Sequence, residues 1–97
     1  MELTREEAIA LLNRWKVNSS DIQVMLAAGG ITLGFTGKVA ELSATSVQLL
    51  GSGGAEAVLS FAEASFDWGD KREMPMVTRF ESFLTASLPH CDFVLAE

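Results

Sequence analysis

The chain has 97 residues, which is the size of one small domain. Hydrophobic residues make up 48% and charged residues 21%, which excludes a chain that is disordered throughout. We expect residues 1–97 to form a single domain. Thirteen acidic residues against seven basic ones give a net charge of −6. This charge disfavours nucleic acid and anionic membranes as partners, because both attract clusters of basic residues.

The N-terminal segment is polar and acidic, whereas a secretory signal needs a basic start and an apolar run. No stretch approaches the roughly 18 apolar residues of a membrane span. The single cysteine, Cys91, cannot form an intrachain disulfide, which fits a reducing compartment. We therefore expect a soluble cytoplasmic protein that does not bind membranes.

Residues 4–17 have the pattern of a helix. Thr4 and Glu7 have the spacing of a capping box, in which each side chain accepts a hydrogen bond from the other residue's backbone N–H. Four apolar residues then recur at helical spacing and form one predicted buried face: Ala8, Leu11, Leu12 and Trp15.

After this helix the apolar period shortens from about 3.6 to about 2, which indicates strands. The four predicted strands cover residues 22–26, 31–42, 47–50 and 56–68. Short turns between them predict antiparallel neighbours. Gly34 and Gly37 lie inside the second strand, where glycine indicates a bend or a close approach of two backbones. The apolar parity changes between Phe61 and Phe66, which predicts a break near Glu63.

Beyond the charged residues 69–73, apolar residues recur every three or four positions and predict a second helix over residues 75–88. Pro75 suits its first turn, and Pro89 would end it. Residues 91–95 alternate as a short final strand. The expected fold class is therefore α+β, with an N-terminal helix, a strongly bent antiparallel sheet or small barrel of about five strands, and a second helix before the last strand.

Residues 4–68 resemble the Sm and Sm-like family, in which an N-terminal helix precedes a small barrel of five bent strands. The resemblance rests on the alternating segment Ile22–Leu26, the turn Gly29-Gly30 and the segment Gly37-Lys38-Val39. It implies an Sm-like barrel and assembly into a ring through strand edges. The RNA-contacting motifs of the family are absent, because Ser43-Ala44-Thr45-Ser46 replaces the first motif and no Arg-Gly pair occurs in the sequence. The resemblance therefore implies an architecture and not RNA binding.

The segment His90-Cys91-Asp92 is the one cluster of catalytic residue types in the sequence. A cysteine nucleophile needs a base within hydrogen-bond reach. Neighbouring residues of a strand point to opposite faces, so His90 and Cys91 are poorly placed to pair. Cys91 also shares the parity of Phe93 and Leu95, so we interpret it as a small core residue and predict no catalytic residue.

We expect no metal and no cofactor. One histidine and one cysteine cannot complete a structural zinc site without carboxylates. Asp67, Asp70 and Glu73 lie close together in the sequence but lack the spacing of a calcium loop. The glycine-rich segment 51–54 lacks the lysine and the hydroxyl residue of a P-loop, so we interpret it as a hairpin turn.

Trp68, Met74 and Met76 are the candidate interface residues. Trp68 ends a predicted strand beside the charged loop, where large rings are often partly exposed and used for contact. The two methionines would add soft apolar surface. The remaining aromatic residues fall on predicted apolar faces and are expected in the core: Trp15, Phe35, Phe61, Phe66, Phe80, Phe83 and Phe93.

Three functions are consistent with the sequence. The leading hypothesis is a non-enzymatic domain that acts through self-association, as a homo-oligomer, or through binding of another protein. Its apolar residues exceed what one small core readily hides, and the edges of the predicted fourth and final strands are exposed unless paired. The second is an Sm-like ring that binds nucleic acid, which would require four cations to converge: Lys38, Lys71, Arg72 and Arg79. The third is a small-ligand or thiol-dependent site around His90-Cys91-Asp92.

Overall fold

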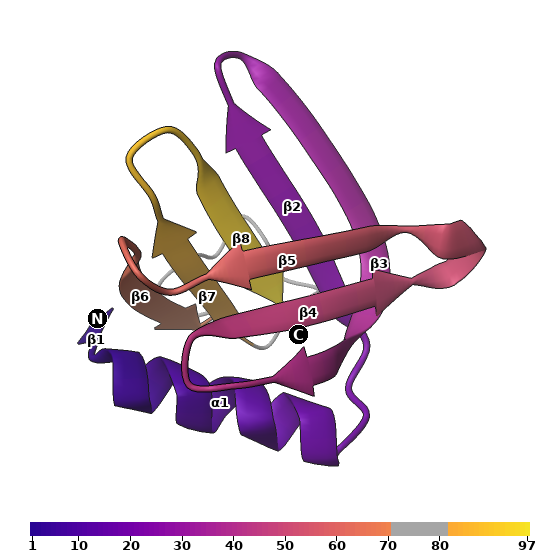
Figure 1. Ribbon diagram of the computed structural model, residues 1–97, viewed down its shortest axis with the longest axis horizontal. Helices are drawn as coiled ribbons and strands as arrows, with labels where there is room; N and C mark the ends of the chain where they lie inside the picture. Colours follow the sequence, from indigo (N-terminus) through magenta and orange to yellow (C-terminus); the bar gives the residue numbers. More distant parts are fainter. Residues whose placement is uncertain (71–81) are drawn as a thin grey trace.

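The computed structural model describes residues 1–70 and 82–97, which form one α-helix, one short 3-10 turn and eight strands (Figure 1). The elements in chain order are β1 (Glu2–Leu3), α1 (Arg5–Val17), β2 (Ile22–Ala28), β3 (Ile31–Leu42), β4 (Ser46–Gly51), η1 (Ser52–Gly54), β5 (Glu56–Ser60), β6 (Ser65–Asp70), β7 (Ser82–Ser87) and β8 (Asp92–Ala96). All strand pairs are antiparallel and belong to one sheet with the order β1-β6-β7-β8-β2-β3-β4-β5. The α+β class is confirmed.

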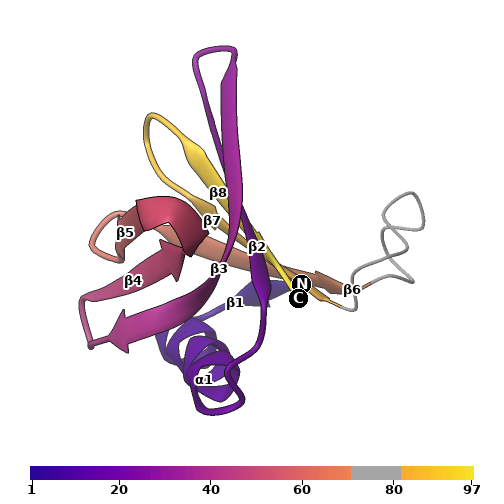
Figure 2. The ribbon, with the colours of Figure 1, turned by 90° about the vertical axis from the view of Figure 1, so that its right-hand side faces the viewer.

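The sheet folds over itself into two layers. In Figure 1, β4 and β5 cross in front of β2, β7 and β8, and the side view in Figure 2 separates the two layers. β3 belongs to both, because it pairs with β2 through its first half and with β4 through its second half. Inward side chains of both layers and of α1 form one core. The described strands do not close into a barrel, since the sheet ends at β1 on one side and at β5 on the other.

Two glycines allow the layers to cross closely. Gly37 of β3 lies opposite Gly51 of β4 in the strand register. A Cβ atom on Gly37 would collide with the backbone carbonyl of Leu50, and a Cβ atom on Gly51 would lie 2.6 Å from Cδ2 of Phe35. Gly34 is less restricted, with 3.3 Å from an added Cβ to the Val24 carbonyl oxygen. The predicted close approach of backbones is therefore confirmed most clearly at Gly37.

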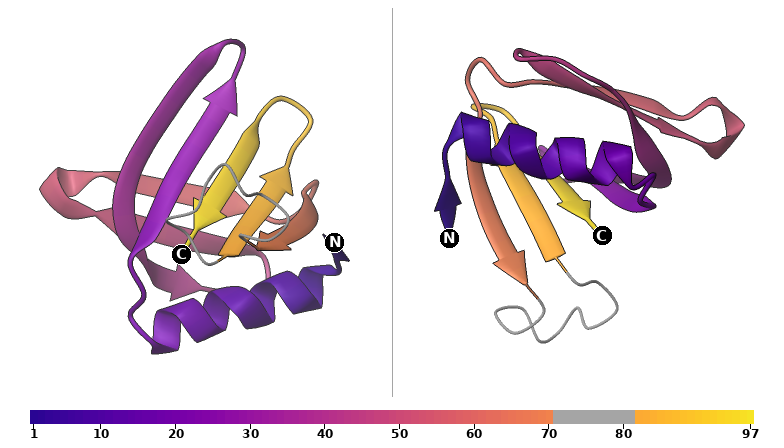
Figure 3. Two further views of the ribbon diagram at one scale, coloured as in Figure 1. Left: turned by 180° about the vertical axis from the view of Figure 1, so that it is seen from behind. Right: turned by 90° about the horizontal axis from the view of Figure 1, so that it is seen from below.

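The N-terminal helix is confirmed almost residue for residue. The Thr4 hydroxyl accepts a hydrogen bond from the Glu7 backbone N–H at 3.1 Å, and the Glu7 carboxylate accepts one from the Thr4 N–H at 2.9 Å. The predicted apolar face is buried in the core: Ala8, Leu11, Leu12 and Trp15. Seen from below in Figure 3, α1 lies across the opening between the two layers of the sheet. The helix thus covers one end of the core.

The first three predicted strands are confirmed as β2, β3 and β4, and each hairpin partner is antiparallel as expected. The predicted fourth strand is two strands, β5 and β6, which residues 61–64 separate. This is the break that the change of parity near Glu63 predicted. Four of the six phenylalanines are buried, Phe35 is half-buried, and Phe80 lies outside the described residues.

The second helix predicted over residues 75–88 is wrong where the structure describes it, because Ser82–Ser87 is strand β7. Leu84 and Ala86 are buried on one face of this strand and Phe83 on the other, although Ser87 on the Phe83 face is exposed. Because buried residues lie on both faces, Phe83 and Leu84 are adjacent and interrupt the period of 2. Together with Phe80 and Leu88 they have the spacing of a helix in the sequence. The remaining residues of the prediction, 75–81, lie outside the described part of the chain.

The prediction of about five strands is also wrong, because the sheet contains β1, a divided fourth strand and β7 in addition. The final strand is predicted to have an edge that is exposed unless another strand pairs with it. In the structure β8 lies inside the sheet and is paired on both sides, with β7 and with β2. Of the helices that the structure describes, none has the length and hydrophobicity needed to cross a membrane, and α1 has 13 residues.

Candidate functional site: the open edge at β5

β5 ends the sheet and pairs with β4 along one side. Two hydrogen bonds fix which backbone groups face β4. At one end the Gly51 N–H donates to the Ala55 carbonyl oxygen at 2.8 Å. At the other end the Phe61 N–H donates to the Thr45 carbonyl oxygen at 2.9 Å. Both pairs fall in the same register as the β4–β5 ladder, so they define its alternation.

In an antiparallel ladder, hydrogen-bonded pairs alternate with pairs that are not hydrogen-bonded. The β5 residues whose N–H and C=O groups face β4 are therefore Ala57 and Leu59. The backbone groups of Glu56, Val58 and Ser60 point away from β4, along the outer edge of the sheet. Within the described ranges no strand covers this edge.

An apolar groove of about 330 Å³ runs beside this edge. Four consecutive residues of β5 and the preceding turn, 55–58, line it, so the groove meets the edge of the strand and not one face alone. The other wall is formed by side chains of β2, β3 and β8: Val24, Leu26, Leu33, Phe35 and Phe93. Unpaired backbone groups thus lie next to an apolar surface.

Two large apolar side chains of the groove are strongly exposed, Leu33 at 61% and Val58 at 58%. Glu56 is the one charged residue among the described groove-lining residues. Its carboxylate accepts a hydrogen bond from Nε2 of Gln48 at 2.9 Å. The groove therefore offers apolar contact and backbone hydrogen bonds, with a single negative charge at its rim.

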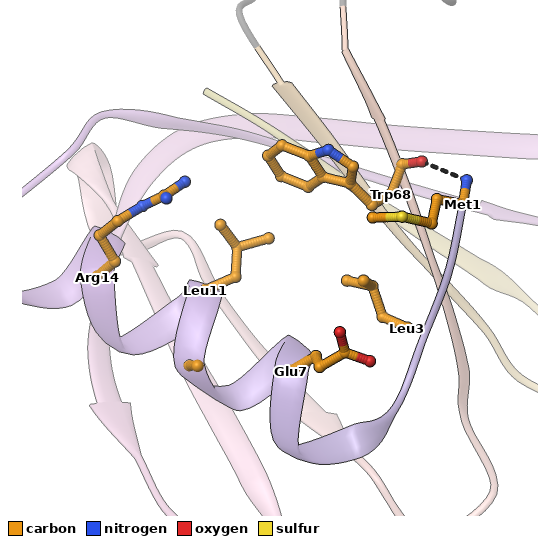
Figure 4. Close-up of a pocket in the computed structure, with 7 residues that line it drawn as sticks. Met1, Leu3, Glu7, Leu11, Arg14 and Trp68 are labelled. Carbon is orange, nitrogen blue, oxygen red and sulfur yellow. Dashed lines mark hydrogen bonds between the residues drawn. The ribbon is translucent and has the colours of Figure 1, made fainter.

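Trp68, the predicted interface residue, borders a different hollow, of about 360 Å³, between α1 and β6 (Figure 4). Its side chain is partly buried and packs against the core. Its backbone exchanges two hydrogen bonds of 2.7 Å with Met1. In Figure 4 the Arg14 side chain extends from α1 toward the indole ring. Met74 and Met76, the other predicted interface residues, lie outside the described residues.

His90 and Cys91 line a third hollow, of about 420 Å³, between the β7–β8 turn and the Gly29-Gly30 turn. His90 is exposed, whereas Cys91 is partly buried and packs against the core, in line with the interpretation of Cys91 as a small core residue. The Cys91 carbonyl oxygen accepts a hydrogen bond from the Leu88 N–H at 2.9 Å, which closes the turn. In the part of the chain that the structure describes, no three metal-ligating side chains converge.

Of the four cations that a nucleic-acid site would need, Lys38 alone lies in the described part of the chain. Lys38 forms an ion pair with Asp21 at 2.8 Å and donates to the Ser19 carbonyl oxygen at 2.6 Å. Lys71, Arg72 and Arg79 are outside the described ranges. A proposal of nucleic-acid binding therefore has no support from the placement of Lys38.

The sequence matches no protein-family model, no curated protein and no solved structure. The resemblance to the Sm-like family therefore stays a prediction. The functional assignment depends on the geometry of the chain itself.

The residues of the β5 groove were not singled out from the sequence. Leu33, Phe35 and Val58 are ordinary apolar positions of predicted strands. What brings them together is the pairing of β8 with β2 and the crossing of β5 over both. The one available signal was the exposed edge expected for the fourth strand, and β5 does lie at the edge of the sheet.

Proposed function

We propose that this chain is a non-enzymatic protein-binding domain that receives an extended segment of another protein at the edge of β5. The observation that supports this most directly is the unpaired backbone of Glu56, Val58 and Ser60 beside an apolar groove. An added strand would gain main-chain hydrogen bonds from the edge and side-chain contacts from the groove. This combination is the basis of peptide recognition by strand addition.

The arrangement of the layers favours an isolated extended segment over a folded second copy. In Figure 1 the β2–β3 hairpin and the β7–β8 turn extend beyond the outer edge of β5. A single added strand can pair with β5 and lie over these two projecting turns. Two copies that paired through their β5 strands would be related by a two-fold axis normal to the sheet, so their β2–β3 hairpins would lie on the same side of the joined sheet. The two hairpins would then project toward each other and compete for one space.

A peptide library displayed on phage and selected on the immobilised chain tests this function. The control protein is the Val58→Pro variant, which lacks the backbone N–H that points outward at the centre of β5. Because the Val58 N–H points away from β4, proline at this position leaves the β4–β5 hydrogen bonds in place. Circular dichroism and the unfolding midpoint check that the variant is folded.

We expect selected peptides to bind the native chain and to lose at least about tenfold in affinity on Val58→Pro, which corresponds to about 1.4 kcal/mol. Peptides that bind both proteins equally would contradict strand addition. Light scattering over about 1 to 200 µM tests the alternative of self-association, because an oligomer forms by mass action as the concentration rises. An oligomer that Val58→Pro dissociates would assign the edge to a second copy.

A further inference from the structure

We propose that the segment bound at β5 has apolar residues opposite Ala57 and Val58 and a basic residue opposite Glu56. This inference rests on the proposed function, because it specifies the chemistry of the strand that the β5 edge accepts. It follows from the two faces of β5, which differ in composition, and from the charges around the groove.

The inward face of β5 determines which ligand residues enter the groove. Ala57 and Leu59 point inward, Leu59 being 1% exposed and Ala57 half-buried. Residues directly opposite each other in an antiparallel pair lie on the same face of the sheet. A ligand residue opposite Ala57 therefore points into the groove, toward Leu33 and Phe93. The small Ala57 side chain leaves the space that a larger apolar ligand residue would fill.

The outward face of β5 determines which residue types suit the ligand positions opposite Val58 and Glu56. Val58 and Glu56 both lie on this face, as do Gln48 and Leu50 of β4, which pair with them. A ligand residue opposite Val58 therefore meets exposed apolar surface, and a β-branched side chain suits that position. A ligand residue opposite Glu56 meets a carboxylate.

The charge of the site selects a basic residue opposite Glu56. One Glu56 oxygen accepts the Gln48 bond, and a carboxylate has further acceptor capacity. Glu56 is exposed, so a single ion pair there contributes modestly. The net charge of −6 also favours the approach of a cationic segment over an acidic one. A basic ligand residue is therefore favoured both by the Glu56 carboxylate and by the net negative charge of the chain.

Two synthetic peptides test the pattern with the full chain, measured by fluorescence polarisation at low salt. The first reads Thr-Val-Leu-Lys-Leu-Thr, so that in an antiparallel pairing lysine lies opposite Glu56 and leucine opposite Ala57. The second carries glutamate in place of lysine. We expect the lysine peptide to bind the native chain about tenfold more tightly, and Glu56→Lys to reverse the preference. Equal affinities of both peptides on both proteins would overturn the basic position.

A matched pair of leucine variants tests the groove. Leu33→Ser changes an exposed leucine that lines it, whereas Leu50→Ser changes an exposed leucine of β4 that does not. We expect Leu33→Ser to weaken the lysine peptide about tenfold and Leu50→Ser to leave its affinity unchanged. Equal effects of the two substitutions would overturn the apolar anchor in the groove.

The outcomes separate this inference from the proposed function. If the library yields peptides that depend on Val58 but have neither the adjacent apolar residues nor the basic residue, the chemistry proposed here is wrong and strand addition stands. If no peptide depends on Val58, both are wrong. If the native chain forms an oligomer that Leu33→Ser and Val58→Pro both dissociate, the groove belongs to a second copy and the peptide ligand is overturned.

Discussion

The two ends of the sheet differ in how their edges are protected. At one end β1 has two residues, and the chain turns directly from it into α1. The Met1 amine donates to the Trp68 carbonyl oxygen at 2.7 Å and pairs with Asp67 at 3.1 Å. At the other end β5 has five residues, with an exposed valine at its centre and an apolar groove beside it.

This difference indicates where the molecule can accept another chain. Natural sheets protect their edges with short strands, lysine, proline, bulges or a covering element. The β1 end has a short strand and a neighbouring helix. β5 contains neither lysine nor proline, and Glu56 is its one charged residue. The open edge is therefore the end of the sheet that remains available for pairing.

The largest expected effect concerns the crossing that attaches the open edge to the rest of the fold. Gly37→Ala places a Cβ against the Leu50 carbonyl, and the backbone of Leu50 cannot move aside without separating β3 from β4. We expect a loss of about 3 kcal/mol in the free energy of unfolding, measured by urea denaturation. Gly34→Ala, whose Cβ would have 3.3 Å to the nearest atom, is the control and should lose less than about 1 kcal/mol.

Amide hydrogen exchange measures directly how well the backbone is hydrogen-bonded at the β5 edge and at the β1 edge. In the unliganded chain the amides of Val58 and Glu56 should exchange at least about 100-fold faster than those of Ala57 and Leu59, because the first pair points outward and the second bonds to β4. The Trp68 amide, which donates to the Met1 carbonyl oxygen at 2.7 Å, should be protected at the other edge. Uniform protection along β5 would show that the edge is already paired in solution.

The smallest effect tests the protected end. Thr4→Ala removes the hydroxyl that accepts the Glu7 N–H at the junction of β1 and α1. We expect a loss of about 1 kcal/mol in the free energy of unfolding, measured by urea denaturation. Thr32→Ala, at an exposed position of β3, is the control and should change stability by less than about 0.5 kcal/mol. If the two threonines behaved alike, the capping box would not contribute to this end.

The features that were predicted correctly from the sequence depend on neighbouring residues. The capping box of α1, the alternation in β2 and β3 and the break near Glu63 are local patterns, and each has a direct structural counterpart. The features that were missed depend on pairing between distant segments. The segment of β7 is predicted to be helical because Phe83 and Leu84, buried on opposite faces, break the period of 2, whereas its actual conformation depends on pairing with β6 and β8.

The groove was missed for the same reason. Phe93 and Leu26 are partners in the β8–β2 register, although 67 positions separate them in the chain. Val58 reaches the same site only because β4 and β5 cross over that pair of strands. The prediction of Trp68 as an interface residue rests on its neighbours in the sequence, yet in the structure it lines a hollow together with Met1 and residues of α1. Local periodicity contains no information on such pairings.

The bend of β3 has a mechanical consequence. Its N-terminal half carries Leu33, which lines one wall of the groove, and its C-terminal half pairs with β4, which in turn pairs with β5 at the other wall. The angle between the two halves of β3, near the Gly37–Gly51 contact, therefore sets the distance between the two walls. A strand bound in the groove would contact both Leu33 and β5, and it would therefore oppose any change in the angle between the β4–β5 pair and the β2–β3 pair.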